Sequence, residues 1–579
     1  MSKRLTYIAA LILSAATVIS TGTKATAQKK KAEFVTHISF DIKHSVAVDE
    51  MIYGQMLEDC NDSVIYGGLV DHNGNENPAV RNLLQALDIP VMRWPAGTYI
   101  HEYHWKNGIG PKEHRPTVAM KCWGGTDPNT FGTDEFLQWC EKMGVPAYIN
   151  FNMSNSLQYG GTIGEAIDWM DYTMGNSAET MGKLRARNGR KEPYAVPFWC
   201  IGNENYGSYG VHRGETATEY SSRLNRWARA IKASYPNASL LGIGHTYEWN
   251  DTVLARNGQL VDFLTLHYYL GARVKDGRLV DEDLTLFAPA KVEANIERCI
   301  PQLDKANLAM GRLADPIRYS VDEWNNRHAV YDGKEWRFSR KDPRCQFDAA
   351  CVAGMLNVFI RQSRAVGMAN YIFPVNGHGL VKTVGCNDAF RTSVYHVFNL
   401  YRHLMKGKAV STNVLGPMAT VDYSKLLVEG DMNKDVENIR KQLPYIDCAA
   451  VLSEDGAVRL ALVNRSSRQK LRADIKLGNW HVRRLWRIES DDINASNTAS
   501  DRNRILPSTQ TYKNANSDND FKLHIKPCGV VIVEFSASTA AKLYFCRNFG
   551  AAETPSEIDH KTPHREDIQT FTNGLTLKK

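Results

Sequence analysis

Two glutamates with similar surroundings are the residues of this chain best suited to chemistry. Glu204 follows the short apolar run Phe198–Gly202, and Glu323 follows the β-rich run Arg318–Val321. Each carboxylate therefore stands near the end of a predicted buried strand, where barrel enzymes hold their catalytic groups. A lone glutamate in such a place is often only a loop or helix-capping residue. Two of them match the pair of carboxylates that glycoside hydrolysis requires.

Short apolar runs alternate with helical segments such as Glu215–Tyr235, and this pattern predicts the fold that positions the glutamates. Eight strands separated by helices predict a (β/α)8 TIM barrel. The alternative is a doubly wound sheet, which usually carries a Gly-rich phosphate turn that this sequence lacks. The predicted strands are Met51–Leu57, Pro90–Trp94, Pro146–Phe151, Phe198–Gly202, Leu240–Gly244, Phe263–Tyr268, Arg318–Val321 and Tyr371–Val375.

Polar residues stand at the end of every predicted strand. Because the carboxyl ends of barrel strands meet at one face, we expect these residues to form a single active site. His267 and Tyr269 are two positions apart, so on a strand they point to the same side. The polar strand ends are Glu58 and Asp59, Arg93 to Thr98, Asn150 and Asn152, Asn203 and Glu204, His245, His267 and Tyr269, Glu323, and Asn376.

Beyond about Gly407 the helical periodicity gives way to short runs punctuated by Gly, Asn, Asp and Ser, which is typical of an antiparallel β-sandwich. A chain of 579 residues is also too long for one ordinary domain. We therefore predict five segments: a signal peptide at 1–27, a lead and a strand joining the sandwich at 28–48, a catalytic barrel at 49–406, a β-sandwich at 407–535 and a flexible tail at 536–579.

The first residues predict export. Lys3 and Arg4 precede the apolar stretch Leu5–Ile19, and Ala25-Thr26-Ala27 is a small-x-small cleavage site. The apolar stretch is too short to be a convincing membrane anchor. We expect a periplasmic or extracellular protein without a membrane anchor, whose mature chain begins near Gln28.

Composition argues against two other classes of function. A net charge of +7, with no stripe of Lys and Arg interleaved with aromatic residues, argues against nucleic acid as a partner. The eleven cysteines show neither CxxC nor Cys/His spacing, so we expect no metal site and no cofactor. Most of the cysteines are expected to be small buried residues.

Five motifs resemble those of glycoside hydrolase family 51, the α-L-arabinofuranosidases, and the resemblance covers about Glu58 to Phe535. It implies a clan A barrel with a C-terminal sandwich, a retaining mechanism and no metal. Many members of the family are oligomers, so a homo-oligomer is also expected. The motifs are Arg93-Trp-Pro-Ala-Gly, His104-Trp-Lys-Asn-Gly-Ile-Gly-Pro-Lys-Glu-His-Arg-Pro116, Phe198-Trp-Cys-Ile-Gly-Asn-Glu204, Leu266-His-Tyr-Tyr269 and Val321-Asp-Glu-Trp-Asn325.

The resemblance also implies roles for individual residues. Glu204 resembles the general acid/base, which must be protonated when the leaving group departs, and Glu323 resembles the nucleophile, which must stay ionised. Arg93 and Tyr269 match residues that hold the nucleophile, since a cation and a phenol donor favour a charged carboxylate. We expect both to contact Glu323, with the two catalytic carboxyl groups about 5–5.5 Å apart. The other expected substrate-binding residues are Glu58, Thr98, Trp123, Asn203 and His267.

Three positions depart from the family pattern near the expected sugar pocket. Thr98 replaces an asparagine, Arg327 replaces a tryptophan, and Phe373 stands where a glutamine is common. The leading hypothesis is an exported, exo-acting α-L-arabinofuranosidase that acts on arabinan, arabinoxylan or their oligosaccharides. Two alternatives stay open: an endo-β-1,4-glucanase or other retaining clan A glycosidase, and a catalytically silent carbohydrate-binding barrel.

Overall fold

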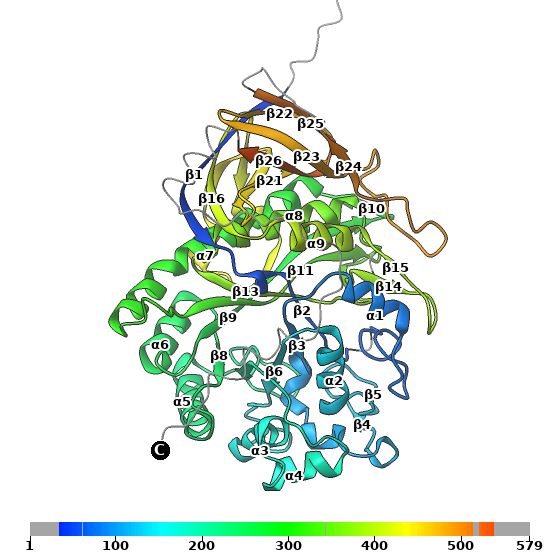
Figure 1. Ribbon diagram of the computed structural model, residues 1–579, viewed down its shortest axis with the longest axis vertical. Helices are drawn as coiled ribbons and strands as arrows, with labels where there is room; N and C mark the ends of the chain where they lie inside the picture. The colour runs from blue at the N-terminus through cyan, green and yellow to red at the C-terminus, as the bar shows by residue number, and fades with distance from the viewer. Residues whose placement is uncertain (1–33, 61, 342, 513–519, 538–579) are drawn as a thin grey trace, which may run out of the picture.

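The structure is a computed structural model that describes residues 34–537, except residues 61, 342 and 513–519. The predicted signal peptide and nearly all of the predicted tail lie outside the described residues. The described chain forms a barrel and a sheet domain that pack against each other, with helices between them (Figure 1).

Eight parallel strands close into a barrel, because β9 pairs with β11 and β13 pairs with β2. These strands are short apolar runs that are buried on both faces, as parallel strands covered by helices are. The predicted (β/α)8 fold is confirmed. The barrel strands are β2 (Gly54–Met56), β3 (Met92–Trp94), β6 (Ala147–Phe151), β7 (Phe198–Ile201), β8 (Ser239–Ile243), β9 (Phe263–Lys275), β11 (Arg318–Tyr331) and β13 (Val366–Tyr371).

The prediction for the eighth strand is wrong. It was expected at Tyr371–Val375, whereas β13 spans Val366–Tyr371. The preceding helix α8 spans Gln346–Arg361. Both segments are buried and apolar, and hydrophobic periodicity cannot separate the end of a buried helix from the start of a buried strand.

Helices surround the barrel, and several begin with side-chain caps that their sequences supply. In the helix that follows β7, Thr216 and Glu219 form a capping box, each side chain satisfying a backbone N–H of the first turn. The helices are α1 (Pro78–Gln85), α2 (Thr133–Met143), α3 (Ile163–Met174), α4 (Thr180–Arg187), α5 (Ala217–Ser234), α6 (Tyr247–Asn257), α7 (Glu282–Ala309), α8, α9 (Ser393–Leu404) and the one-turn α10 (Lys434–Glu437).

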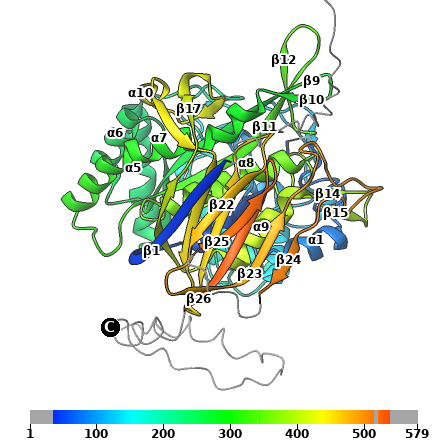
Figure 2. The ribbon, with the colours of Figure 1, turned by 90° about the horizontal axis from the view of Figure 1, so that it is seen from above.

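Two barrel strands continue far past the barrel. β9 and β11 stay paired as far as Val274 and Val330, well beyond the ends expected from the sequence. Three short strands widen this extension: β10 (Arg278–Val280), β12 (Trp336–Ser339) and β18 (Val428–Gly430). Figure 2 shows the hairpin that ends in β12 projecting from the body of the protein.

The sheet domain is one continuous nine-stranded sheet whose two halves enclose a common core. β1 (Val35–Ala47) lies between β16 and β22, so the segment before the barrel joins the sheet that follows it. Successive side chains of a strand point to opposite faces and so contribute to two different cores. Cys448 belongs to the core enclosed by the sheet domain, and the next residue, Ala449, belongs to the core shared with the barrel. The other strands are β16 (Lys408–Leu415), β20 (Ile446–Leu452), β21 (Val458–Asn464), β22 (Leu471–Lys476), β23 (Trp480–Ile488), β24 (Ser508–Thr511), β25 (Asp520–Ile525) and β26 (Val530–Ala537).

Helix α8 joins the two parts. All but one of its residues are buried, and the barrel core continues through it to Val451, Val463 and Ile532 of the sheet. Asn357 of α8 donates a hydrogen bond of 2.8 Å to Asp447 of β20. The barrel and the sheet domain therefore share one hydrophobic core.

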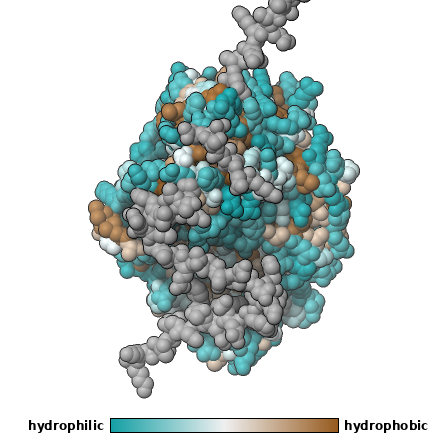
Figure 3. All heavy atoms as spheres, turned by 45° about the horizontal axis from the view of Figure 1, so that its top comes forward, coloured by the Kyte–Doolittle hydropathy of each residue, from teal (hydrophilic) through white to brown (hydrophobic). Residues whose placement is uncertain are grey.

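Three two-stranded antiparallel pairings complete the described fold: β4 (Val118–Ala119) with β5 (Thr126–Asp127), β14 (Val381–Thr383) with β15 (Ala389–Arg391), and β17 (Met418–Asp422) with β19 (Arg440–Pro444). The face seen in Figure 3 is mostly hydrophilic, with hydrophobic residues in small separate patches. Within residues 34–537 no helix is long and apolar enough to cross a membrane. The ten cysteines of this part of the chain are free thiols; eight are buried, Cys122 is half-buried and Cys386 is exposed.

Candidate active site

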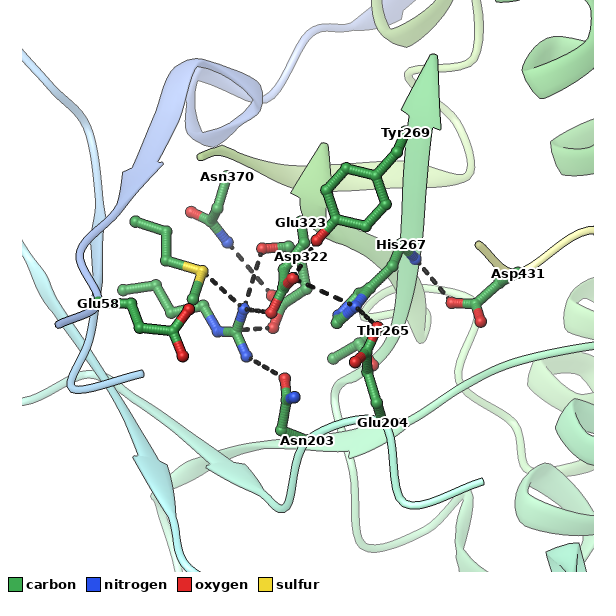
Figure 4. A network of polar contacts seen from close by, with 12 residues as sticks. Glu58, Asn203, Glu204, Thr265, His267, Tyr269, Asp322, Glu323, Asn370 and Asp431 are labelled. Atoms are coloured by element: carbon green, nitrogen blue, oxygen red, sulfur yellow. Dashed lines mark hydrogen bonds and ion pairs between the residues drawn. The ribbon is translucent and has the colours of Figure 1, made fainter. Parts of the chain in front are cut away.

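The carboxyl ends of the barrel strands open into a cavity of about 640 Å³. Six of the nine predicted site residues line it, and the departures from the family pattern, Arg327 and Phe373, line it as well. Arg93, Asn203 and His267 lie behind the cavity wall, each at most 2% exposed. Figure 4 shows Glu58, Asn203, Glu204, His267, Tyr269 and Glu323 converging from different strands and the turns that follow them. The residues at the cavity are Glu58, Thr98, Trp123, Glu204, Tyr269 and Glu323.

Glu204 stands in a tight turn after β7. Its backbone is left-handed, with φ of +44°, and Gly202 in the same turn has φ of +100°. Asn205 holds the turn: its Oδ1 accepts from the Asn203 N–H at 3.0 Å, and its amide donates to Glu215 at 3.0 Å. A non-glycine residue in this conformation costs on the order of 1 kcal/mol, and such strain is typical of functional sites. The turn directs the Glu204 carboxylate toward the ring of His267, whose Nδ1 is 2.9 Å away.

Glu323 is held as an anion by three groups. Arg93 Nη1 donates to Oε1 at 2.7 Å, the Tyr269 hydroxyl donates to Oε2, and His267 Nδ1 lies 3.6 Å from Oε2. Burial alone would raise the pKa of this carboxyl, but the charges of His267 and Arg93 and the Tyr269 hydrogen bond lower it to about 2. Arg93 and Tyr269 thus contact the carboxylate that has to remain ionised.

A bulge in β11 lets one arginine hold two consecutive carboxylates. The pairing of β11 with β9 shifts between Val321 and Glu323, so Asp322 and Glu323 both reach Arg93. Arg93 Nε lies 3.0 Å from Asp322 Oδ2, and Arg93 is fully buried. Asp322 was not among the predicted site residues, although its position beside Glu323 was a signal. Its carboxylate also accepts hydrogen bonds from Tyr148, Ser320 and Asn370.

Polar strand ends from β6 and β7 complete the surroundings of Arg93. Asn203 Oδ1 accepts from Arg93 Nη2 at 2.6 Å, and Asn150 Oδ1 accepts from Nε at 3.2 Å. These bonds fix the plane of the guanidinium and hence the Glu323 oxygen that it contacts. Asn203, expected to bind sugar hydroxyls, contacts Arg93 here.

His267 lies between the two glutamates. Burial would lower its pKa, but the charge of Glu323 and the hydrogen bond to Glu204 raise it to about 9. The ring is therefore an imidazolium at neutral pH, and it donates from Nδ1 to Glu204. Its backbone N–H donates to Asp431 at 2.7 Å, and Asp431 also lies 2.6 Å from Nδ1 of His245. Asp431 follows β18, far from any barrel strand in sequence, and no local pattern indicated it.

Glu58 is a further carboxyl group at the cavity. Burial and the negative charge of Glu323 raise its pKa to about 7, so it titrates near neutral pH. Its Oε1 accepts hydrogen bonds of 3.1 Å from the Tyr99 N–H and from the indole of Trp123. These bonds place Glu58 and Trp123 on the same side of the cavity.

Not every predicted strand end joins the site. Asn152 donates to the carbonyls of Tyr103 and Tyr159 and supports a loop. Asn376 lies beyond the end of β13 and contacts Ser63 and Thr383 outside the catalytic cavity. The residue that β13 supplies is instead Asn370, which reaches Asp322.

Glu204, His267 and Glu323 each offer a donor atom, and these atoms lie within 4.8 Å of one another. A metal ion would need a neutral imidazole here. The two carboxylates favour the imidazolium, and Arg93 already neutralises Glu323. The donor set therefore fits a hydrogen-bonded acid–base group better than a metal centre.

Family models and curated relatives that match different parts of the chain carry the same description. The family model described as "Alpha-L-arabinofuranosidase 1 domain" matches residues 83–282, and "Alpha-L-arabinofuranosidase C-terminal domain" matches residues 322–528. "Probable alpha-L-arabinofuranosidase C" of Aspergillus terreus is 31% identical over 457 residues, 75% of this chain and 85% of the relative. "Intracellular exo-alpha-L-arabinofuranosidase" of Bacteroides ovatus is 27% identical, covering 75% of this chain and 82% of the relative.

A solved structure is similar over almost its whole length. It is the thermostable GH51 α-L-arabinofuranosidase of Thermotoga petrophila RKU-1, with a TM-score of 0.73 and 28% sequence identity. The match covers 86% of this chain and 99% of that protein. It includes both the barrel and the sheet domain.

The charge of His267 should be measurable as a pH-dependent part of the stability. The folded state raises its pKa from 6.5 to about 9, so the imidazolium stabilises the fold fully below pH 6.5. This stabilisation is lost as the pH rises through 9. In His267→Gln the amide can still donate to Glu204 but carries no charge. Between pH 6.5 and 9 the free energy of unfolding of the native protein should fall, relative to the variant, by on the order of 3 kcal/mol.

Urea unfolding at several pH values measures this difference. His114→Gln, which removes an exposed imidazole, is the matched control and should unfold in parallel with the native protein. If the curves for His267→Gln and the native protein also run parallel from pH 6.5 to 9, the imidazolium does not contribute to stability.

Proposed function

The chain belongs to glycoside hydrolase family 51, the α-L-arabinofuranosidases, and we propose that it releases terminal α-L-arabinofuranosyl residues from non-reducing ends by double displacement. The observation that carries this proposal is the pair of unlike carboxylates. Glu323 is kept ionised by Arg93, Tyr269 and His267, whereas Glu204 stands opposite with an oxygen within 4.8 Å of one of Glu323. This separation supports a retaining reaction, since an inverting pair needs roughly 6.5–9.5 Å.

In the first step a Glu323 oxygen attacks the anomeric carbon while Glu204 gives its proton to the departing glycosidic oxygen. The bond from the anomeric carbon to the leaving group breaks, and a covalent glycosyl–Glu323 intermediate forms. The Arg93 and Tyr269 hydrogen bonds fix the attacking carboxylate, and all three strands that carry these groups belong to the barrel. Holding the nucleophile in one orientation lowers the entropic part of the barrier.

In the second step Glu204, now a carboxylate, takes a proton from water, and the water oxygen attacks the anomeric carbon. The bond to Glu323 breaks, and both carboxyl groups return to their starting states. His267 Nδ1 contacts Glu204, and this contact holds the Glu204 carboxyl group in place through both steps. Glu58 is proposed to bind hydroxyls of the sugar ring, and Trp123 is proposed to form an aromatic wall beside it.

Arabinose-containing glycans are the substrate class that this family implies, and arabinan, arabinoxylan or their oligosaccharides are the proposed natural substrates. The side chains at Thr98, Arg327 and Phe373 all line the cavity, so the departures from the family pattern fall where the sugar would bind. This placement is the observation that favours the alternative, an endo-β-1,4-glucanase or another retaining glycosidase. A homo-oligomer, which the family resemblance implies, stays a prediction.

Glu204→Gln tests both the activity and the proposed acid. The native protein should hydrolyse an aryl α-L-arabinofuranoside and not an aryl β-cellobioside. The variant should lose about 10²- to 10⁴-fold in kcat/KM on an arabinofuranosyl oligosaccharide, whose leaving group needs a proton. It should lose far less on a dinitrophenyl arabinofuranoside, whose leaving group departs without protonation.

Glu248→Gln, which replaces an exposed carboxylate of α6 by an amide, is the control. It should keep both activities. Equal losses on both leaving groups in Glu204→Gln would remove Glu204 from the acid role. Turnover of the cellobioside alone would favour the glucanase alternative.

The stereochemistry of the product tests the role of Glu323. Two displacements each invert the anomeric carbon, so the sugar released first should keep the α configuration of the substrate. Proton NMR recorded during the first minutes of hydrolysis resolves the two anomers before they interconvert. Release of the β anomer first would contradict direct attack by Glu323.

We also propose that the protein is exported, periplasmic or extracellular, with cleavage near Ala27. Residues 1–27 lie outside the described residues, and the support is their charged, apolar and small-residue pattern. The mass of the protein recovered from an exporting host should match a chain that begins at Gln28. A mass that includes Met1 to Ala27 would count against export by this signal.

A further inference from the structure

The hairpin of β11 and β12 extends the face of the sheet that carries the nucleophile. Glu323, Arg327 and Tyr331 stand at intervals of four positions along β11, so they point to the same face. Tyr331 pairs directly with Trp336 of β12, and Phe338 stands two positions from Trp336 on the same strand. Trp336 and Phe338 therefore share this face, on the part of the hairpin that projects from the body of the protein (Figure 2).

The catalytic cavity reaches the base of this hairpin. Phe338 and Arg340 line the cavity together with Glu323. Trp336 stands two positions farther out than Phe338, and two residues of a strand span roughly 6.6 Å, which is comparable with the length of one sugar unit. A glycan whose terminal sugar reaches Glu323 can therefore continue over Phe338 to Trp336.

The aromatic rings on this face are open to solvent. Phe338 is 46% exposed and Trp336 is 37% exposed. The ring of Tyr331 lies beside that of Trp336, with 5.3 Å between the ring centres. Single exposed apolar residues are ordinary on a protein surface, but exposed rings gathered at the mouth of a cavity are typical of a binding surface.

Cations of the neighbouring strand β9 support the two outer rings. Arg273 lies 5.4 Å from the centre of the Trp336 ring, and Lys275 lies 5.3 Å from the centre of the Tyr331 ring. Arg273 also lies 3.8 Å from Asp281. Such cation–π contacts favour one orientation of an exposed ring, so less side-chain entropy is lost when a ligand packs on it.

The inner ring, Phe338, is supported in the same way. Arg327 and Arg340 lie 5.0 and 5.4 Å from its centre. Arg327 pairs with Glu429 at 3.2 Å, and Arg340 pairs with Asp62 at 2.7 Å. Because these two cations already have carboxylate partners, this part of the surface offers a ligand an aromatic ring more than a charge.

We propose that Phe338 and Trp336 bind the main chain of the glycan from which the arabinofuranosyl residue is removed, and that this main chain consists of neutral pyranose sugars. This inference rests on the proposed function, because it takes the occupant to be another part of the same substrate. A pyranose chair has a flat face of C–H groups that packs on an aromatic ring. Two rings in line suit consecutive sugars of an extended chain, as in the β-1,4-xylose main chain of arabinoxylan. The furanose main chain of arabinan offers a less flat face.

The test compares three substrates: an aryl α-L-arabinofuranoside, a long xylo-oligosaccharide with one arabinofuranosyl branch, and an arabinan oligosaccharide of equal length. Trp336→Ala should raise KM about three- to tenfold on the branched xylo-oligosaccharide. Its kcat should stay near the native value, because the ring packs on the main chain equally in the ground state and the transition state. KM for the other two substrates should change less than about twofold.

Arg337→Ala is the matched control, since it removes a large exposed side chain from the opposite face of β12. It should keep the native KM on all three substrates. Trp336→Phe keeps an aromatic ring and should keep KM on the branched xylo-oligosaccharide within about twofold of the native value. An unchanged KM in Trp336→Ala, or an equal rise in Arg337→Ala, would overturn the proposal.

Binding separates this proposal from the proposed function. Calorimetry with xylohexaose, which has no arabinofuranosyl group, should detect binding to the native protein that Trp336→Ala weakens. The same result with a protein that is inactive on arabinofuranosides would support the binding surface and refute the activity. Absence of xylohexaose binding, together with normal arabinofuranoside turnover, would refute the binding surface alone.

Sedimentation velocity tests whether a second copy of the chain covers these rings instead. The native protein and Trp336→Ala should sediment alike. A smaller assembly in Trp336→Ala, with KM unchanged on every substrate, would make the rings a contact between copies and overturn the proposal.

Discussion

The active site depends on one buried guanidinium, that of Arg93, which two consecutive carboxylates share. A fully buried charge is costly unless it is paired and hydrogen-bonded. Here Asp322 and Glu323 supply the opposite charge, Asn150 accepts a hydrogen bond from Nε, and Asn203 accepts one from Nη2. These partners come from β6, from β11 and from the turn after β7, whereas Arg93 belongs to β3. The same interaction thus joins separate strands of the barrel and fixes the orientation of Glu323.

The negative charge of Glu323 then sets the protonation of its neighbours. It raises the pKa of His267 to about 9 and, together with burial, that of Glu58 to about 7. The ionised Glu323 therefore stands beside the Arg93 guanidinium, the His267 imidazolium, the titrating Glu58 and the opposing Glu204. Differences of this kind between nearby groups allow a single cavity to hold both a nucleophile and a proton donor at the same pH.

Much of this arrangement could be predicted from the sequence, because in a barrel the ends of all strands meet at one face. That rule is enough to bring Glu204, Glu323, Arg93 and Tyr269 together from their local patterns alone. It fails where a pattern is ambiguous or absent. β13 begins at Val366, soon after the polar residues Arg361 to Arg364 at the end of α8 and five residues before the predicted start, so Asn376 was expected where Asn370 stands. Asp431 reaches His267 only through the pairing of β18 with β9, a long-range contact without a local signal.

The length of β9 and β11 has a consequence for how this enzyme can diversify. The inner parts of these strands carry Tyr269 and Glu323, and their outer parts lead to Arg327 and, through β12, to Arg340. Chemistry constrains the inner parts, whereas the outermost residues, Arg273 to Lys275 and Ala329 to Tyr331, pair with each other and with the short strands β10 and β12. Insertions or exchanges in the outer hairpins can therefore accumulate without disturbing the catalytic carboxylates. Natural variation, or a laboratory library confined to these hairpins, can change which glycans are accepted while the hydrolytic reaction itself stays the same.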